Sequence, residues 1–112
     1  DDKEPIYVQL AQSVLENIMR GAFSEGEPVP SVRQVASQER INPLTVSRGY
    51  QILADDGLLE KRRGLGMFVA VGARQKALER ERRRFLSEEW PTTRDRIELF
   101  DLDLQTLLEE KT

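Results

Sequence analysis

Residues 30–69 read PSVRQVASQERINPLTVSRGYQILADDGLLEKRRGLGMFV, and this stretch decides the fold. It contains two signals for the start of a helix. Ser31 is followed three residues later by Gln34, which is the pattern of a capping box. Asn42 followed by Pro43 combines a good N-cap with the residue preferred at the first helical position. We therefore predict a short helix that ends near residues 39–40, a tight turn, and a second helix over about 43–56.

A basic hairpin is predicted directly after these helices. Gly57 ends the helical pattern, and two β-prone runs follow at 58–62 and 67–71. The residues between them are Arg63-Gly64-Leu65-Gly66, with glycines available where a hairpin needs positive φ. Three cations lie at the tip of this hairpin: Lys61, Arg62 and Arg63.

The helix over 43–56 has two different faces. Val46, Tyr50 and Leu53 recur at helical spacing and are expected to be buried, and Gly49 indicates a close contact with another helix. The opposite side carries a mostly polar set with one apolar exception, namely Leu44, Ser47, Arg48 and Gln51, with Thr45 beside them.

The flanking segments are predicted to be helical. An amphipathic helix is expected over 6–20, ended by Gly21. After Gly72 the composition favours a helix over 73–89, which we expect Trp90-Pro91 to break. Shorter helices should follow over 92–100 and after the N-cap Asp103. The cations of the long segment are expected to form a solvated face: Arg74, Lys76, Arg80 and Arg82 to Arg84.

The predicted fold class is mainly α with a small β-hairpin wing. A winged helix-turn-helix domain would span residues 1–72, and a tail of short helices would span 73–112. The apolar stripe of the tail is too thin to stabilise a lone helix, so it should pack on something, such as a second copy. The residues expected at such an interface are Leu78, Phe85, Leu86, Trp90, Ile97, Phe100, Leu104, Leu107 and Leu108.

Composition excludes several classes of function. The 112 residues include neither Cys nor His, which removes the usual ligands for zinc, copper and iron and the usual nucleophile pairs. No phosphate-binding loop is visible, so we expect neither catalysis nor a metal or cofactor. No apolar run is long enough for a bilayer. We therefore expect a cytoplasmic protein without a membrane partner.

The charge distribution favours nucleic acid even though the net charge is −3. Residues 33–84 carry twelve Lys or Arg against six Asp or Glu, whereas residues 1–32 and 85–112 are both acidic overall. Phosphate attraction is local, because salt screens charges over about 10 Å. The basic middle of the chain is therefore the expected interface with double-stranded DNA.

Five stretches together resemble the GntR family of bacterial transcription regulators: PIYVQL at Pro5, PSVRQVA at Pro30, INPLTVSRGY at Ile41, DGLL at Asp56 and RRGLGMFV at Arg62. They cover residues 5–71 at the family's spacing. The phrase NPLTVS and the short tail are similar to the YtrA-like branch, for which the resemblance implies that the tail is a dimerisation element.

The resemblance also implies roles for single residues. Arg33 matches the arginine that reaches DNA from the second helix, Thr45 and Arg48 match contact positions on the recognition helix, and Gly64 and Gly66 match the wing. The chain departs from some branches, which carry arginine where this sequence has Pro43 and Ser47. Base recognition in those branches is therefore not transferred, and more of it falls to Leu44, Ser47 and Arg48.

The chemistry of these side chains suits a DNA reader. The helices capped by Ser31 and Asn42 present free N–H groups to phosphate. Arg48 can bind guanine through two hydrogen bonds, and Leu44 can contact a thymine methyl group. Arg62 and Arg63 would reach the backbone or the minor groove.

We expect a dimeric repressor that binds a pseudo-palindromic operator. The alternative is a winged-helix module that binds protein without DNA, although the polar and basic face of the third helix disfavours it. A small-molecule effector could bind between the tails of two copies, but no residue pattern in the sequence supports such a site.

Overall fold

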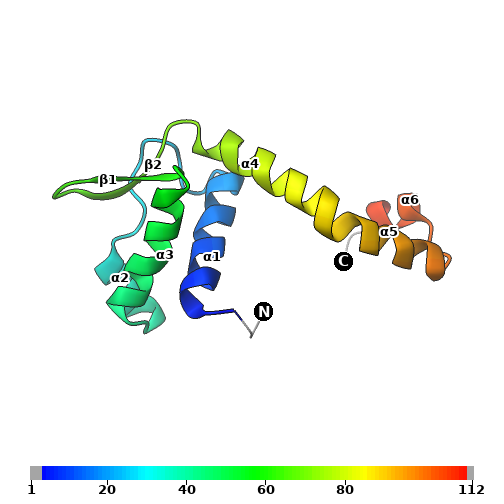
Figure 1. Cartoon of the computed structure of the whole chain (residues 1–112), viewed down its shortest axis with the longest axis horizontal. Coiled ribbons are helices and arrows are strands. Elements are labelled where there is room, and N and C mark those ends of the chain that lie inside the picture. The colour runs from blue at the N-terminus through cyan, green and yellow to red at the C-terminus, as the bar shows by residue number, and fades with distance from the viewer. Residues whose placement is uncertain (1–3, 111–112) are drawn as a thin grey trace. The chain divides into compact units, whose positions relative to one another are not determined.

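The computed structural model describes residues 4–110 and divides the chain into two compact units, the first ending at Leu78 and the second beginning at Glu79 (Figure 1). Helix α4 (Ala73–Arg84) contains the division. Because each unit is internally compact, each is described in turn.

Three helices form the body of the first unit: α1 (Ile6–Arg20), α2 (Val32–Glu39) and α3 (Pro43–Asp55). Each begins or ends where the local chemistry predicted. Gly21 ends α1 in the left-handed conformation at φ 83°. The Ser31 hydroxyl accepts from the N–H of Gln34 at 3.0 Å and caps α2.

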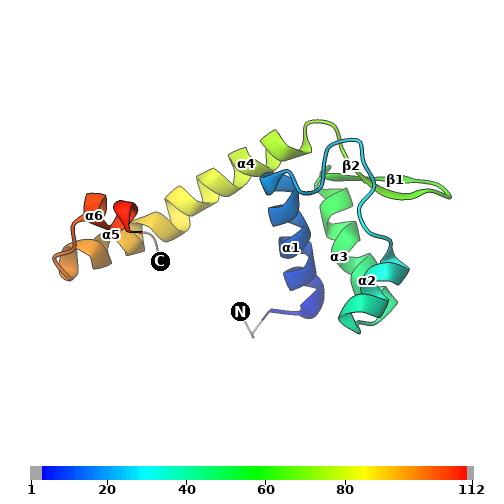
Figure 2. The same ribbon diagram turned by 180° about the vertical axis from the view of Figure 1, so that it is seen from behind.

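Helix α3 lies at the centre of the first unit and packs against α1, α2 and the hairpin, as Figure 2 shows from behind. The Asn42 side chain caps α3 by accepting from the N–H of Leu44 at 2.8 Å. Val46, Tyr50 and Leu53 are at most 2% exposed, which confirms the predicted inner face. They join a single core to which all elements of the unit contribute apolar side chains.

Gly49 is buried where α3 crosses α1. A Cβ atom at this position would lie 2.9 Å from the backbone oxygen of Tyr7 and 3.3 Å from Leu10 Cδ2. Real Cβ atoms do not approach backbone oxygen so closely. The glycine therefore lets the two helices come close together, which confirms the predicted helix contact.

The hairpin consists of β1 (Leu59–Arg62) and β2 (Gly66–Val69), paired antiparallel from Leu59 opposite Val69 to Arg62 opposite Gly66. β1 lies within the predicted range 58–62, whereas β2 begins one residue and ends two residues before the predicted range 67–71. The cause is a three-residue turn in which Gly64 takes φ 77°, so that Gly66 already pairs within the ladder. The loop before α2 adds a short third segment, where the N–H of Val29 donates to the carbonyl of Met67 at 3.0 Å.

The first turns of α4 belong to the core of the first unit. Ala73 and Ala77 are at most 1% exposed. The carboxylate of Glu25 accepts from the N–H of Gly72 at 2.8 Å and from the N–H of Arg74 at 3.2 Å. Arg74 and Lys76 are exposed, as expected of a solvated face, but both side chains also have partners on the protein.

Both of these side chains donate to backbone carbonyls of the first unit. The Arg74 Nε donates to Met19 O at 2.8 Å, and the Lys76 Nζ donates to Asp56 O at 2.7 Å. Carbonyls at the end of a helix lack partners within that helix, so basic side chains stabilise them. These bonds fasten the start of α4 to the ends of α1 and α3.

In the second unit, the π-helical turn η1 (Phe85–Glu89) leads from α4 directly into α5 (Trp90–Leu99). The predicted break at Trp90-Pro91 was therefore wrong. The N–H of Trp90 donates to Phe85 O, five residues earlier, and Pro91 lies in the first turn of α5, where its missing N–H costs little. The wide turn thus accommodates the proline without interrupting the helical course.

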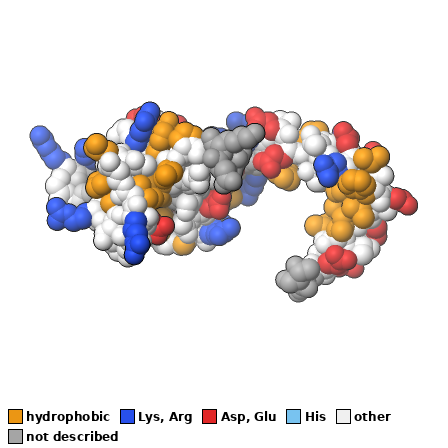
Figure 3. Space-filling model, turned by 90° about the horizontal axis from the view of Figure 1, so that it is seen from below, with side chains coloured by type: hydrophobic (Ala, Val, Ile, Leu, Met, Phe, Trp, Pro, Cys, Tyr) orange, Lys and Arg blue, Asp and Glu red, His pale blue; other side chains and the backbone are white. Residues whose placement is uncertain are grey.

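The last described helix is α6 (Leu104–Glu109), and Asp103 is its N-cap as predicted, although the Asp103 side chain makes no capping hydrogen bond to a backbone N–H. The Thr106 hydroxyl donates to Asp103 Oδ2 at 2.6 Å, and this hydrogen bond holds the pKa of the carboxyl below its ordinary value. Among the described residues from 79 onward none is buried. Figure 3 shows hydrophobic side chains gathered in a patch on this unit.

No helix within residues 4–110 is both long enough and apolar enough to cross a membrane.

Candidate nucleic-acid interface

The start of α2 contributes the first part of the site. Its N-cap Ser31 leaves the first N–H groups of the helix at the surface, and Arg33 is exposed in the first turn. A helix N-terminus carries a partial positive charge, and an arginine beside it adds a full one. This end of α2 is therefore suited to an anionic partner such as a phosphate.

The outward face of α3 contributes the second part. Leu44 is 77% exposed, although it is a large apolar residue. Ser47, Arg48 and Gln51 are also exposed, while Thr45 is half-buried at the edge of the face. This arrangement exposes one apolar and several hydrogen-bonding side chains on one face, although the Gln51 amide also donates to Asp55 Oδ1 at 2.8 Å.

The strand register sorts the cations of the hairpin between its two faces. Alternation along β1 places Lys61 on the same face as the buried Leu59, and it places Arg62 on the other face. The Arg62 guanidinium lies 4.1 Å from the centre of the Phe68 ring and 3.3 Å from a Glu60 oxygen. Arg62 is thus engaged within its own hairpin, whereas Arg63 is exposed in the turn.

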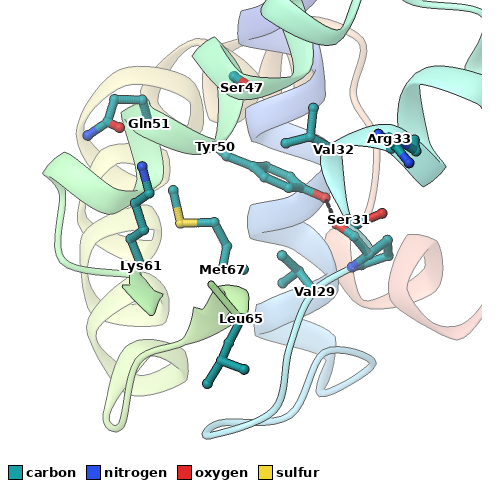
Figure 4. A pocket seen from close by; sticks show the side chains of 12 residues that line it. Val29, Ser31, Val32, Arg33, Ser47, Tyr50, Gln51, Lys61, Leu65 and Met67 are labelled. Atoms are coloured by element: carbon teal, nitrogen blue, oxygen red, sulfur yellow. Dashed lines mark hydrogen bonds between the residues drawn. The ribbon is translucent and has the colours of Figure 1, made fainter. Parts of the chain in front are cut away.

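A groove of about 400 Å³ joins these parts (Figure 4). One wall is the start of α2 with the loop before it, another is α3, and the third is the hairpin. Met67 and Val29 form much of its apolar lining. The polar side chains on it come from all three elements: Ser31, Arg33, Ser47, Gln51 and Lys61.

Tyr50 anchors the floor of this groove. Its ring is 1% exposed, and its hydroxyl donates to the carbonyl of Pro30 at 2.6 Å. Burial raises the pKa of Tyr50 to about 12, so the hydroxyl stays protonated and remains a donor. This hydrogen bond ties the loop before α2 to α3.

The structure brings together part of the predicted set. The groove is lined by Ser31, Arg33, Ser47 and Gly66. Leu44 and Asn42 lie at the exposed N-terminal end of α3, and Arg63 and Gly64 at the tip of the hairpin. Arg48 is not among the residues that line the groove, because its guanidinium lies over the ring of Tyr7, 4.1 Å from the ring centre.

Sequence reasoning missed two contributions to this surface. Lys61 was noted only as one of three cations, and the alternation of the strand could have placed it on the inner face. Leu65, which is 71% exposed at the tip, also lines the groove. The contact between Arg48 and Tyr7 had no signal in the sequence, since forty residues separate the two side chains along the chain.

Curated relatives match the part of the chain that builds this site. A regulator called YhcF from Bacillus subtilis is 39% identical over 70 residues, which cover 62% of this chain and 58% of that protein. The transcriptional repressor YtrA of the same organism is 36% identical over 75 residues, which cover 67% of this chain and 58% of that protein. The chain thus spans less than two thirds of the length of these relatives.

Solved structures show the same fold. A transcriptional regulator from Oenococcus oeni superposes with a TM-score of 0.74 at 28% identity, over 86% of this chain and 79% of that one. BusR from S. agalactiae, solved in complex with its busAB-promotor DNA, superposes with a TM-score of 0.64 at 26% identity, over 94% of this chain and 52% of that one.

These matches agree with the expected class of protein. The relatives are named as transcriptional regulators and not as enzymes, and the alternative of a protein-binding module gains no support from them. Residues 6–69, more than half of the chain, match the profile of bacterial regulatory proteins, gntR family. The chain therefore belongs to the GntR family of bacterial regulatory proteins.

Proposed function

We propose that this chain is a sequence-specific DNA-binding transcription regulator that acts in the cytoplasm as a dimeric repressor on a pseudo-palindromic operator. The observation that carries the proposal is the grouping of Arg33, Lys61 and the outward face of α3 around one groove. DNA recognition needs cations for the phosphates and a rigid probe for the base edges. This face supplies both.

In the proposed complex, α3 enters the major groove with its N-terminal half. Leu44 would contact a thymine methyl group, Ser47 a base edge, and Arg48 a guanine through two hydrogen bonds. Thr45 would contact DNA from the edge of this face. The capped N-termini at Ser31 and Asn42 would each receive a phosphate oxygen, with Arg33 beside the first of them.

The hairpin would follow the backbone or the adjacent minor groove. A Cβ atom added at Gly64 or Gly66 would meet nothing within 4 Å, so the hairpin tip is open on these sides. A partner can therefore approach the backbone closely. Arg63 and Lys61 would supply charge directly, whereas Arg62 would first have to leave Glu60 and Phe68.

The second unit would hold two copies together through its exposed apolar surface. Several large side chains there are 37% to 76% exposed, which is costly in water unless a partner covers them. We propose a homodimer through the predicted interface from Leu78 to Leu108. Two recognition helices about 34 Å apart could then enter successive major grooves, and the similarity to a protein named as a repressor supports the direction of regulation.

Titration of labelled duplexes at several salt concentrations tests DNA binding. We expect the affinity to depend on sequence and to fall with salt by a slope of about −0.9 for each phosphate contact. Arg48→Ala should weaken specific binding by about 1–3 kcal/mol and relax one base position. Arg94→Ala, which removes an exposed arginine of the second unit, is the matched control. An affinity that depended neither on salt concentration nor on DNA sequence would contradict the proposal.

Sedimentation equilibrium tests the dimer with a closely matched pair of variants. Leu108 is 76% exposed and belongs to the proposed interface, whereas Leu99 is 75% exposed and does not. Leu108→Ser should shift the protein towards the monomer, and Leu99→Ser should leave the equilibrium unchanged. Equal effects of the two substitutions would contradict the proposed interface.

A further inference from the structure

Tyr7 and Arg48 form a contact between α1 and α3 at the edge of the recognition face. The carbon atom of the Arg48 guanidinium lies 4.1 Å from the centre of the Tyr7 ring. Tyr7 is half-buried, while Arg48 is exposed. The ring is therefore held by its own helix and by packing, and the arginine lies over it from the solvent side.

The position of the ring follows from the close crossing of the two helices. Gly49, the neighbour of Arg48, allows the backbone of α3 to approach the carbonyl of Tyr7. Any side chain at that position would meet this carbonyl and the Leu10 side chain. The crossing therefore places Tyr7 close to Arg48, the residue that precedes Gly49 in α3.

Stacking on a ring uses the flat face of a guanidinium and leaves the N–H donors at its edge available. The attraction at an exposed site is about 0.5–1 kcal/mol. An unrestrained arginine loses much rotational freedom when it is fixed in a complex, and a side chain that is already held loses less. A ring beneath Arg48 thus lowers the cost of using Arg48 in recognition.

We propose that Tyr7 is a positioning residue that orients Arg48 for contact with DNA. The proposal rests on the proposed function, because it gives Arg48 a partner on the duplex. It assigns α1 a part in recognition beyond its place in the core. Tyr7 acts through Arg48, so its effect on DNA affinity disappears when the arginine is absent.

A double-mutant cycle on the full-length protein tests this directly. Affinities for a duplex obtained by selection would be measured for wild type, Tyr7→Leu, Arg48→Ala and the double variant. We expect Tyr7→Leu to weaken binding about two- to fivefold in the wild-type background. It should have no further effect in the Arg48→Ala background, and Tyr7→Phe, which keeps the ring, should restore affinity to within about twofold.

A second background separates positioning from a general loss of structure. In an Arg63→Ala background, which changes only the exposed turn of the hairpin, Tyr7→Leu should keep its two- to fivefold effect. A Tyr7→Leu effect that persisted in the Arg48→Ala background would overturn the proposal, as would the absence of any effect in wild type. Failure of wild type to prefer any duplex would instead show that the proposed function itself is wrong.

Discussion

The two units of this chain use apolar residues in opposite ways. Every buried hydrophobic side chain among the described residues lies at or before Ala77, in the first unit. The second unit keeps Phe85, Leu86, Phe100 and Leu108 between 45% and 76% exposed. Both units contain helices, so the difference in exposure of their apolar side chains depends on which other elements pack against those helices.

This contrast indicates where the stability of each unit comes from. The first unit has a buried core within one chain, although Leu44 and Leu65 on it stay exposed, and its folding should therefore not depend on concentration. The second unit exposes surface that a partner would have to cover, and its stability should then follow mass action. In the proposed function, the DNA-binding face therefore lies on the unit with its own core, and dimerisation is assigned to the second unit.

Two leucine substitutions, one in each unit, should give the largest difference in stability. Leu53 is 2% exposed in α3, whereas Leu99 is 75% exposed in α5. Leu53→Ala should lower the free energy of unfolding by about 2–5 kcal/mol, because it leaves a cavity in the core. Leu99→Ala should change it by less than about 0.5 kcal/mol. Urea titration of both variants, monitored by circular dichroism, measures the difference, and comparable losses would contradict the assignment of the core.

An intermediate effect concerns the boundary between the units. A fragment ending at Gly72 follows the sequence-based boundary but loses the buried Ala73 and Ala77 and the hydrogen bond from Lys76. It should be about 2 kcal/mol less stable than a fragment ending at Leu78. Thermal and urea unfolding of the two fragments under identical conditions would show this. Equal stability would place the boundary at Gly72.

A smaller effect concerns the hydrogen bond beneath the groove. Tyr50→Phe removes the donor to Pro30 and should destabilise the first unit by about 1 kcal/mol at neutral pH. The folded-state pKa of Tyr50 is raised to about 12, so the neutral hydroxyl contributes stability below the ordinary pKa of about 10. This contribution is lost as pH rises from about 10 towards 12.

The difference in the free energy of unfolding between wild type and Tyr50→Phe should therefore become smaller as pH rises from about 10 towards 12. Urea unfolding at a series of pH values from neutral to alkaline would measure it. A gap that stayed constant with pH would show that the Tyr50 hydroxyl is not the titrating group.

Local chemistry explains why much of the first unit could be predicted. Ser31, Asn42 and Gly21 act on backbone groups within a few residues of themselves, so the sequence alone places the helix ends. The inner face of α3 follows from helical spacing, and Gly49 signals a close crossing without naming the partner helix. These predictions were confirmed.

The features that could not be predicted depend on residues far apart or on competing local rules. Arg48 lies over Tyr7 because two helices cross, which no local pattern records. Pro91 was expected to break a helix, yet the π-helical turn before it carries the chain onward. Arg74 and Lys76 are exposed as expected, but their carbonyl partners Met19 and Asp56 are distant in the sequence and no local pattern indicates them.

Selection of binding sites from a pool of random duplexes by the 112-residue chain, with footprinting of the enriched sequences, tests whether it is a dimeric DNA-binding regulator. We expect an enriched inverted repeat whose two halves are separated by about one helical turn of DNA or a multiple of it. Protection should extend over both halves. Enrichment of no sequence, or of a single unpaired half-site, would contradict a dimeric regulator that reads DNA through α3 and the hairpin.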